Sequence, residues 1–187
     1  MRHPRLLHRE DAVLLVVDVQ EAFVRVMPAL PDLGRKIAVL IEGAGILGVP
    51  VVVTEQYPRG LGSTIEPVKS ALEKIPEHRH FEKDCFSCCG ATDFTGWLDS
   101  TGRRQVIVCG IEAHVCVNQT CHDLIHRGYN VHLVSDAVES RIPENKRVGI
   151  EKIIGAGAVP SSVEMALFEM LVQSGTEEFK AVQKLVK

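Results

Sequence analysis

The sequence of 187 residues has no apolar run approaching the roughly 20 residues that a transmembrane helix needs. Its longest apolar run near the start, Ala12–Val17, is too short for the core of a signal peptide and is followed by an acid. Charge of one sign is also scarce: 24 acidic and 21 basic residues leave a net charge of −3. Nucleic-acid binding needs a basic surface. We therefore expect a cytoplasmic protein with neither a membrane nor a nucleic-acid partner.

Internal repeats, low-complexity tracts and linkers are absent as well. Hydrophobic residues make up 45% of the chain and charged residues 24%, a balance that is typical of globular proteins and excludes a disordered or fibrous chain. A chain of this length can bury its own core. We therefore expect residues 1–187 to form a single domain.

The cysteines do not indicate a disulfide framework. Disulfide-dense chains are usually short and secreted, and this chain has enough apolar residues to form a core without such cross-links. We expect free and mostly buried thiols, each still a candidate nucleophile. They are Cys85, Cys88, Cys89, Cys109, Cys116 and Cys121.

Short apolar runs alternate with longer segments of helical periodicity. Continuous apolar, β-branched runs predict strands that are covered on both faces. The predicted strands are 12–17, 49–54, 78–82, 105–109, 130–135 and a short one near 158–159, and the predicted helices are 31–47, 65–72, 93–100, 113–127, 144–154, 161–171 and 177–186, with a loop over 57–63. This alternation predicts an α/β fold with a mostly parallel sheet, in which function gathers at the carboxyl ends of the strands.

Three side chains of complementary chemistry stand at such positions: Asp18 after the first strand, Lys83 after the third, and Cys116 in the first turn of the helix that follows the fourth. Each has an ordinary alternative explanation. The acid also fits a helix cap or a polar plug, the lysine a solvated surface group, and the thiol a small core residue. A thiol at a helix amino terminus, however, can have a lowered pKa.

Taken together, the three groups form a coherent catalytic set. The thiolate attacks a carbonyl carbon, the ammonium stabilises the thiolate and the ionised acid, and the carboxylate takes the thiol proton and passes it to a leaving group. Backbone N–H groups at the start of the helix are suited to hold the developing oxyanion.

From about residue 12 to residue 171 the sequence resembles the isochorismatase-like cysteine hydrolases. Segment 109–117 carries most of this resemblance, and segments 17–20, 81–83, 128–131 and 134–137 also fit. The resemblance implies a Rossmann-like three-layer sandwich with a six-stranded parallel sheet in the order 3-2-1-4-5-6, and usually a homo-oligomer.

The resemblance also implies roles for particular residues. Asp18, Lys83 and Cys116 would form the catalytic triad. A cis peptide bond would lie between Ile111 and Glu112, and the backbone N–H groups of Glu112 and Cys116 would form the oxyanion hole.

The departures from the family pattern narrow the expected chemistry. Nicotinamidases in this family carry an Asp-x-His metal motif after the second strand, but Thr54–Pro58 contains no histidine, so we expect no metal and no cofactor. Isochorismatases that cleave a vinyl ether lack the nucleophilic cysteine, which is present here as Cys116. Segment 54–62 is most similar to the isochorismatase-domain-containing subgroup. The resemblance to this family implies a hydrolase but does not specify its substrate.

Other motifs suggest metal or dinucleotide sites, but their signals are weaker. Cys85–Cys88 matches C-x-x-C, yet a structural zinc site needs a second ligand pair, which the sequence lacks. His122 and His126 have the spacing of ligands on one helix face, although that face is more typical of a solvated or interface surface. His114 fits a lining or structural role. No G-x-G-x-x-G follows the first strand, as a dinucleotide site would require.

We therefore predict a cofactor-independent hydrolase that cleaves a small amide or related C–N bond through an acyl-thioester on Cys116. The alternative is a non-catalytic binding or scaffolding protein that retains the fold. The residues predicted to line the substrate pocket are Gln20, Phe23, Tyr57 and Phe86.

Overall fold

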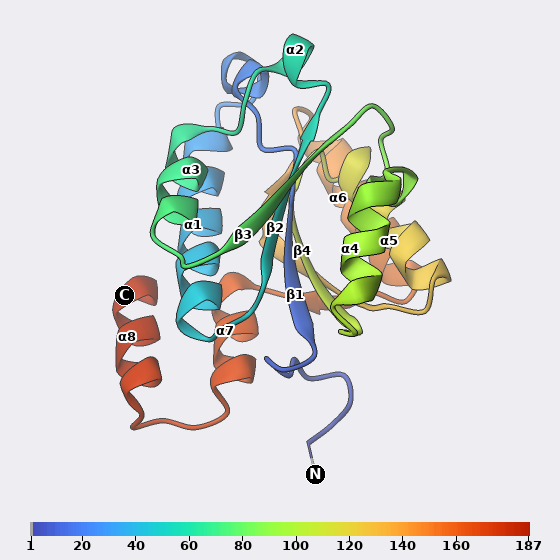
Figure 1. Cartoon of the computed structure of the whole chain (residues 1–187). Helices are drawn as coiled ribbons and strands as arrows, with labels where there is room; N and C mark the ends of the chain where they lie inside the picture. The colour runs from blue at the N-terminus through green and yellow to red at the C-terminus, as the bar shows by residue number, and fades with distance from the viewer. Residues whose placement is uncertain (1) are drawn as a thin grey trace.

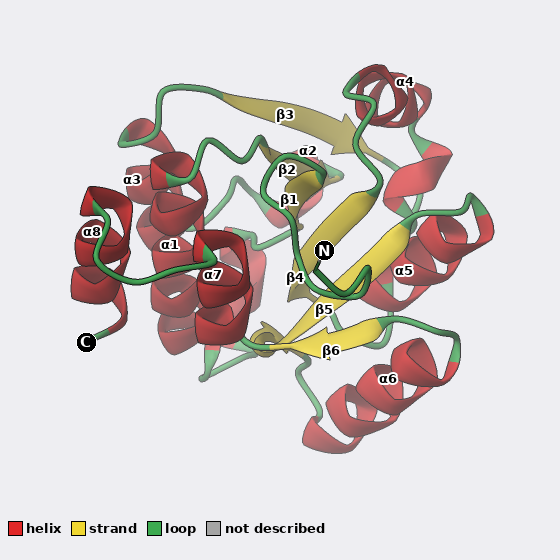
Figure 2. Ribbon diagram, turned by 90° about the horizontal axis from the view of Figure 1, so that it is seen from below, coloured by secondary structure: helices red, strands yellow, loops and turns green. Residues whose placement is uncertain are grey.

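The computed structural model describes residues 2–187 and contains one six-stranded sheet. All strand pairs are parallel, and the strand order is β3-β2-β1-β4-β5-β6, as Figure 2 shows from below. The predicted fold class and strand order are therefore confirmed. The strands are β1 (Ala12–Val17), β2 (Val51–Gln56), β3 (His78–Lys83), β4 (Gln105–Ile111), β5 (Asn130–Glu139) and β6 (Val159–Ser161).

Helices cover both faces of the sheet and complete three layers (Figure 1). Helices α1, α3, α7 and α8 lie on one face and α4, α5 and α6 on the other. The helices are α1 (Leu30–Ile46), α2 (Pro58–Leu61), α3 (Glu66–Glu73), α4 (Thr92–Ser100), α5 (Cys116–His126), α6 (Pro143–Gly155), α7 (Val163–Leu171) and α8 (Glu177–Val186), with 3₁₀ turns η1 (Glu21–Arg25) and η2 (Cys88–Gly90).

Strand β1 explains why its sequence is an unbroken apolar run. Leu14 and Val16 belong to the core beneath α1, whereas Leu15 and Val17 belong to the core beneath α4 and α5. Side chains alternate across a strand, so a central strand covered on both faces must be apolar at every position. All six residues of β1 are buried.

Strand β4 continues past the predicted end at Cys109 and reaches Ile111. Gly110 permits this because its φ of +116° is one that L side chains rarely adopt. A Cβ atom at Gly110 would also lie 2.1 Å from the carbonyl oxygen of Val17 in β1. Gly110 therefore allows the close approach of β1 and β4.

Other boundaries differ from the predictions where tertiary pairing overrides local signals. Strand β2 extends to Gln56, and β5 runs through Ser135 and Asp136 to Glu139 because it pairs along β4. The predicted loop 57–63 contains the short helix α2, which begins at a proline. Helix α5 begins at Cys116 rather than residue 113, since the N–H of Ala113 still donates to the carbonyl of Glu139.

The helices and the cysteines of residues 2–187 each bear on an expectation from the sequence. None of their helices combines the length and apolar character needed to cross a membrane. The six cysteines are free, and Cys88, Cys109, Cys116 and Cys121 are buried while Cys85 and Cys89 are partly buried.

Candidate active site

The carboxyl ends of β1 and β3 and the amino end of α5 bring three chemically complementary groups together. Asp18 follows β1 directly, and its positive φ of +51° turns the chain away from the strand direction. Lys83 is the last residue of β3, and its Nζ atom lies 2.7 Å from Oδ2 of Asp18. Cys116 is the first residue of α5 and lines a cavity together with Asp18.

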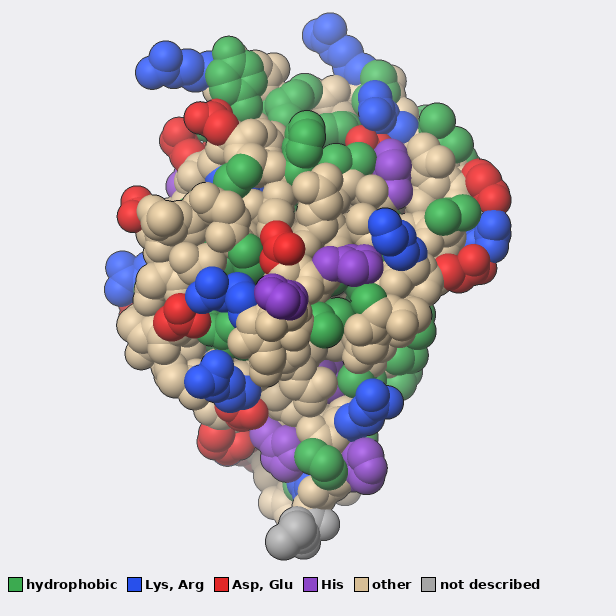
Figure 3. All heavy atoms as spheres, turned by 90° about the vertical axis from the view of Figure 1, so that its right-hand side faces the viewer, with side chains coloured by type: hydrophobic (Ala, Val, Ile, Leu, Met, Phe, Trp, Pro, Cys, Tyr) green, Lys and Arg blue, Asp and Glu red, His purple; other side chains and the backbone are tan. Residues whose placement is uncertain are grey.

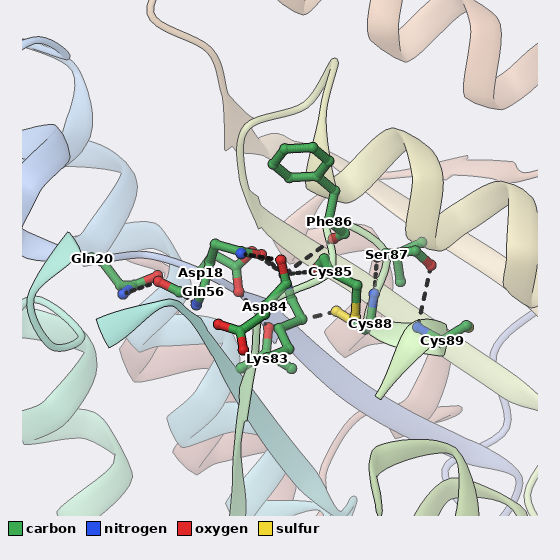
Figure 4. Close-up of polar contacts among 12 residues, drawn as sticks. Asp18, Gln20, Gln56, Lys83, Asp84, Cys85, Phe86, Ser87, Cys88 and Cys89 are labelled. Carbon is green, nitrogen blue, oxygen red and sulfur yellow. Dashed lines mark hydrogen bonds and ion pairs between the residues drawn. The ribbon is translucent and has the colours of Figure 1, made fainter. Parts of the chain in front are cut away.

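Lys83 is enclosed by hydrogen-bond acceptors (Figure 4). Its side chain is fully buried, and its ammonium donates to Asp18 Oδ2, to Gln56 Oε1 at 2.8 Å, and to the carbonyls of Cys85 and Phe86 at 3.1 Å each. Burial is the largest single effect and lowers the pKa of Lys83, but the Asp18 carboxylate and the neighbouring sulfur groups of Cys88 and Cys116 together outweigh it, so the pKa is raised. The ammonium therefore remains charged and holds the carboxylate.

Asp18 has a different donor on each carboxylate oxygen. Oδ2 accepts from Lys83, and Oδ1 accepts from the hydroxyl of Thr54 at 2.8 Å. Thr54 lies beside Val17 in the parallel pairing of β1 and β2, and its carbonyl accepts from the N–H of Asp18 at 3.1 Å. Both side chains are almost wholly buried. The carboxyl group is thus paired and fixed in orientation.

The Cys116 thiol is protonated in the resting protein, which corrects the expectation of a lowered pKa. Burial raises the pKa of Cys116 most strongly, the Asp18 carboxylate raises it further, and Lys83 lowers it by less than those effects. Cys116 is only 7% exposed, which accords with burial being the largest effect. An attack by this sulfur therefore requires proton removal at the time of reaction.

A cavity of about 310 Å³ opens beside the thiol. Of the residues predicted to line a pocket, Phe23 and Phe86 line this cavity. Lys83 does not line the cavity itself, but it contacts two residues that do, Asp18 and Gln56. Five other lining residues, which come from loop ends and strand termini, were not predicted to line a pocket. These are Gln56, Leu61, Ile111, Val115 and Arg141.

Gln20 and Tyr57, which were also predicted to line the pocket, do not line it. Gln20 is fully buried because its amide donates to the carbonyls of Gln56 and Gly62 and accepts from the Gln56 N–H. It therefore stabilises the chain that follows β2. Tyr57 is 54% exposed and its ring lies against Gly60. A glutamine near an acid and an aromatic near a loop are not sufficient signals for a pocket.

Two residues that line the cavity, Glu112 and Cys116, also carry backbone donors. The peptide bond between Ile111 and Glu112, for which the sequence resemblance implies cis geometry, is cis. Helix α5 has no side-chain cap at its amino terminus. Within residues 2–187, the backbone N–H groups of Glu112 and Cys116 have no hydrogen-bond acceptor in the protein. Such N–H groups at a helix start favour an anionic ligand or a developing negative charge.

Glu112 contributes its side chain to a separate contact. Its carboxylate is 6% exposed and accepts from Arg141 twice, from the backbone N–H at 2.9 Å and from Nε at 3.0 Å. Arg141 lines the cavity and is half exposed. The pair fixes the loop after β5 against the turn that precedes α5.

The competing motifs form no second centre. Nδ1 of His114 lies 3.0 Å from the Ser140 hydroxyl, and Nδ1 of His122 lies 2.7 Å from the Asn118 carbonyl. No group of three or more His, Cys, Asp or Glu side chains suited to a metal ion exists among the described residues. The C-x-x-C segment instead places two carbonyls on Lys83.

In the upper part of Figure 3, hydrophobic side chains are numerous and Lys and Arg side chains project beside them, while charged side chains are scattered over the rest of that face. Three large apolar side chains are exposed near the cavity. Phe86 (54% exposed) lines it, and Tyr57 (54%) and Ile142 (56%) each follow a lining residue in the chain. Exposed apolar groups beside a cavity are typical of surfaces that bind a ligand or another protein.

Comparison with known proteins assigns this architecture to one group. Residues 12–165 match the family model described as isochorismatase domain. The chain is 42% identical over 179 residues to the "Secreted isochorismatase effector Isc1" of Phytophthora sojae, covering 95% of this chain and 85% of that protein.

Two further relatives agree. The "Isochorismatase domain-containing protein 1" of Danio rerio is 36% identical over 179 residues, which is 94% of this chain but 61% of that longer protein. The solved structure of "MAR1 Ribonuclease from Caenorhabditis elegans" superposes with a TM-score of 0.90 at 37% identity and covers 97% of this chain and 92% of that chain.

Proposed function

This chain belongs to the isochorismatase-like family, and from that premise we propose that it is a cysteine hydrolase that cleaves a small amide or related C–N bond. The observation that carries the proposal is the contact of one buried carboxylate, Asp18, with Lys83 at 2.7 Å beside the only thiol that lines the cavity among the described residues, Cys116. Acid, cation and thiol are the groups that acyl transfer through a cysteine requires.

In the proposed reaction, Asp18 takes the proton from Cys116 as the sulfur attacks the substrate carbonyl carbon. The resting thiol is protonated because burial and the negative carboxylate raise its pKa, so proton transfer and attack occur together. Lys83 holds the carboxylate in place through the 2.7 Å contact. The protonated Asp18 then gives its proton to the leaving nitrogen as the C–N bond breaks.

The oxyanion that develops on the carbonyl oxygen is held by the backbone N–H groups of Glu112 and Cys116. Their lack of protein acceptors and the uncapped start of α5 support this role. The acyl-thioester is then resolved by a water molecule that loses its proton to Asp18, which regenerates the thiol and releases the acid. No step needs a cofactor or a metal ion.

The wider biological setting is also part of the proposal. We place the protein in the cytoplasm, because its six free cysteines fit a compartment that keeps thiols reduced. We propose a homo-oligomer on the basis of the exposed apolar side chains beside the cavity. A net charge of −3 favours a small molecule over nucleic acid as the substrate.

The test is turnover of a panel of small amides by the wild-type protein and by Cys116→Ala. We expect hydrolysis by the wild type and a loss of at least about 10³-fold in the variant, because the nucleophile is gone. A matched control is Cys121→Ala, which removes a buried thiol from the same helix without touching the cavity. Full activity in Cys116→Ala would contradict the covalent mechanism.

The alternative, a binding or scaffolding protein that retains the fold, gives a different result. The wild type would then hydrolyse no amide in the panel, and iodoacetamide would leave Cys116 unmodified even though the cavity reaches it. Because the C. elegans structure is described as a ribonuclease, a short RNA belongs in the panel. Cleavage of that RNA by wild type and Cys116→Ala alike would contradict the proposal for amides.

A further inference from the structure

A hydrogen-bonded chain of three side chains ends on the carboxylate that the proposed mechanism uses as its base. Thr54 Oγ1 donates to Asp18 Oδ1 at 2.8 Å, and the sulfur of Cys88 lies 3.6 Å from the same hydroxyl oxygen. Thr54 and Cys88 are 1% and 0% exposed, and neither lines the cavity. Neither residue touches a substrate, so any role they have acts through Asp18.

The direction of the chain follows from its chemistry. An ionised carboxylate only accepts hydrogen bonds, so the single hydroxyl hydrogen of Thr54 must go to Asp18. The remaining hydroxyl lone pairs then accept from Cys88, whose thiol must be the donor. Burial, together with the Asp18 carboxylate, raises the pKa of Cys88 to about 11. Cys88 therefore keeps its proton at neutral pH and remains able to donate it.

The chain is anchored at both ends to the elements that form the site. At one end, the Thr54 carbonyl accepts from the N–H of Asp18 at 3.1 Å, so Thr54 holds that residue by both backbone and side chain. At the other end, the N–H of Cys88 donates to Oγ1 of Thr120 at 2.9 Å. Thr120 lies four residues after Cys116 on α5, which is one helical turn.

We propose that Thr54 is a positioning residue for Asp18, and that Cys88 fixes the direction in which the Thr54 hydroxyl points. This proposal rests on the proposed role of Asp18 as the base. Lys83 contacts only Oδ2, so with Lys83 alone the carboxylate could still pivot about that contact. The second donor on Oδ1 removes that freedom and aims the carboxylate at the thiol, which shortens the search for a productive geometry.

The test measures the rate at which iodoacetamide alkylates Cys116, followed by fragment mass spectra because Cys109, Cys116 and Cys121 share one tryptic peptide. In this reaction an S–C bond forms, the C–I bond breaks, iodide leaves and the thiol proton goes to Asp18. We expect Thr54→Val to slow alkylation by on the order of tenfold to a hundredfold. We expect Thr54→Ser, which keeps the hydroxyl, to stay within about threefold of wild type.

Cys88 has its own matched pair. Cys88→Ala and Cys121→Ala each remove a fully buried thiol from the same core, but only Cys88 contacts Thr54. We expect a fewfold loss of Cys116 alkylation in Cys88→Ala and no loss in Cys121→Ala. Thermal unfolding of each variant separates this effect from misfolding, since the two alanine variants lose similar packing.

The outcomes separate this proposal from the proposed function. If Asp18→Asn slows alkylation of Cys116 while Thr54→Val leaves it at the wild-type rate, Asp18 is the base and the role of Thr54 is overturned. Equal losses in Thr54→Val and Thr54→Ser would also overturn it, because the hydroxyl would not be the cause. If Asp18→Asn reacts at the wild-type rate, the proposed function itself fails.

Discussion

The buried Lys83–Asp18 pair and the buried His132 have opposite surroundings. Lys83 and Asp18, at the carboxyl end, are in direct contact and each has further hydrogen-bond partners. His132, in the middle of β5, is 1% exposed, and neither of its ring nitrogens has a partner. Three buried side-chain nitrogen or oxygen atoms in residues 2–187 have no partner, and two of them are the ring nitrogens of His132.

The Lys83–Asp18 pair and His132 compensate for burial in different ways. At the site, the contact with Asp18 and the other hydrogen bonds accompany a raised pKa of Lys83, so the ammonium stays charged although it is buried. At His132 burial lowers the pKa from 6.5 to about 4, and the positive charge of Arg5 contributes, so the ring stays neutral at physiological pH. Lys83, which has partners, therefore keeps its charge when buried, whereas His132, which has none among the described residues, is neutral.

The largest effect is expected at the site. Lys83→Met should reduce the free energy of unfolding by about 3–5 kcal/mol, because it leaves the buried Asp18 carboxylate without its cation. Urea unfolding of the variant measures this loss. Adding Asp18→Asn to Lys83→Met should restore part of the lost stability, since the uncompensated charge is removed. Additive losses in the double variant would show that packing, rather than the charge pair, is responsible.

The next effect concerns His132 and depends on pH. The unfolded chain binds a proton at His132 near pH 6.5, while the folded chain binds it only near pH 4. Stability from the neutral ring is therefore complete above pH 6.5 and is lost as the pH falls toward 4. Between pH 7 and pH 5 this amounts to about 2 kcal/mol, since each pKa unit is about 1.4 kcal/mol.

The variant His132→Leu isolates that contribution. Its free energy of unfolding, measured in urea at pH 7 and pH 5, should fall less than that of wild type by about 2 kcal/mol. Other titrating groups affect both proteins equally and cancel in the difference. An identical pH dependence in the two proteins would mean that the folded protein protonates His132 readily, and the comparison with the site would then break down.

The same contrast explains how much the sequence could reveal. The meeting of Asp18, Lys83 and Cys116 could be predicted because each stands at a strand or helix end, and parallel topology brings such ends together. The apolar run of β1 was sufficient to place that strand correctly. These features depend on local pattern and on general rules of topology, both of which can be read without coordinates.

Features that depend on partners could not be read in this way. The direction of the Cys116 pKa shift depends on how deeply the fold buries the thiol and on the nearby Asp18 carboxylate. Gln20 was assigned to the pocket although its amide turns inward to backbone carbonyls. Thr54 gave no signal because its importance comes from a neighbouring strand. Burial and hydrogen bonding between distant segments decide these cases.

The smallest effect sharpens the comparison, because it involves an ion pair that is only partly buried. Arg141 is 53% exposed, whereas its partner Glu112 is 6% exposed. Arg141→Gln should cost about 1 kcal/mol of unfolding free energy, since solvent screens the guanidinium and the backbone N–H of residue 141 still binds Glu112. Arg127→Gln, at an exposed pair with Asp99, is the control and should change stability by less than about 0.5 kcal/mol. A loss in Arg141→Gln equal to that in Lys83→Met would mean that burial of the acid alone, and not burial of both partners, sets the cost.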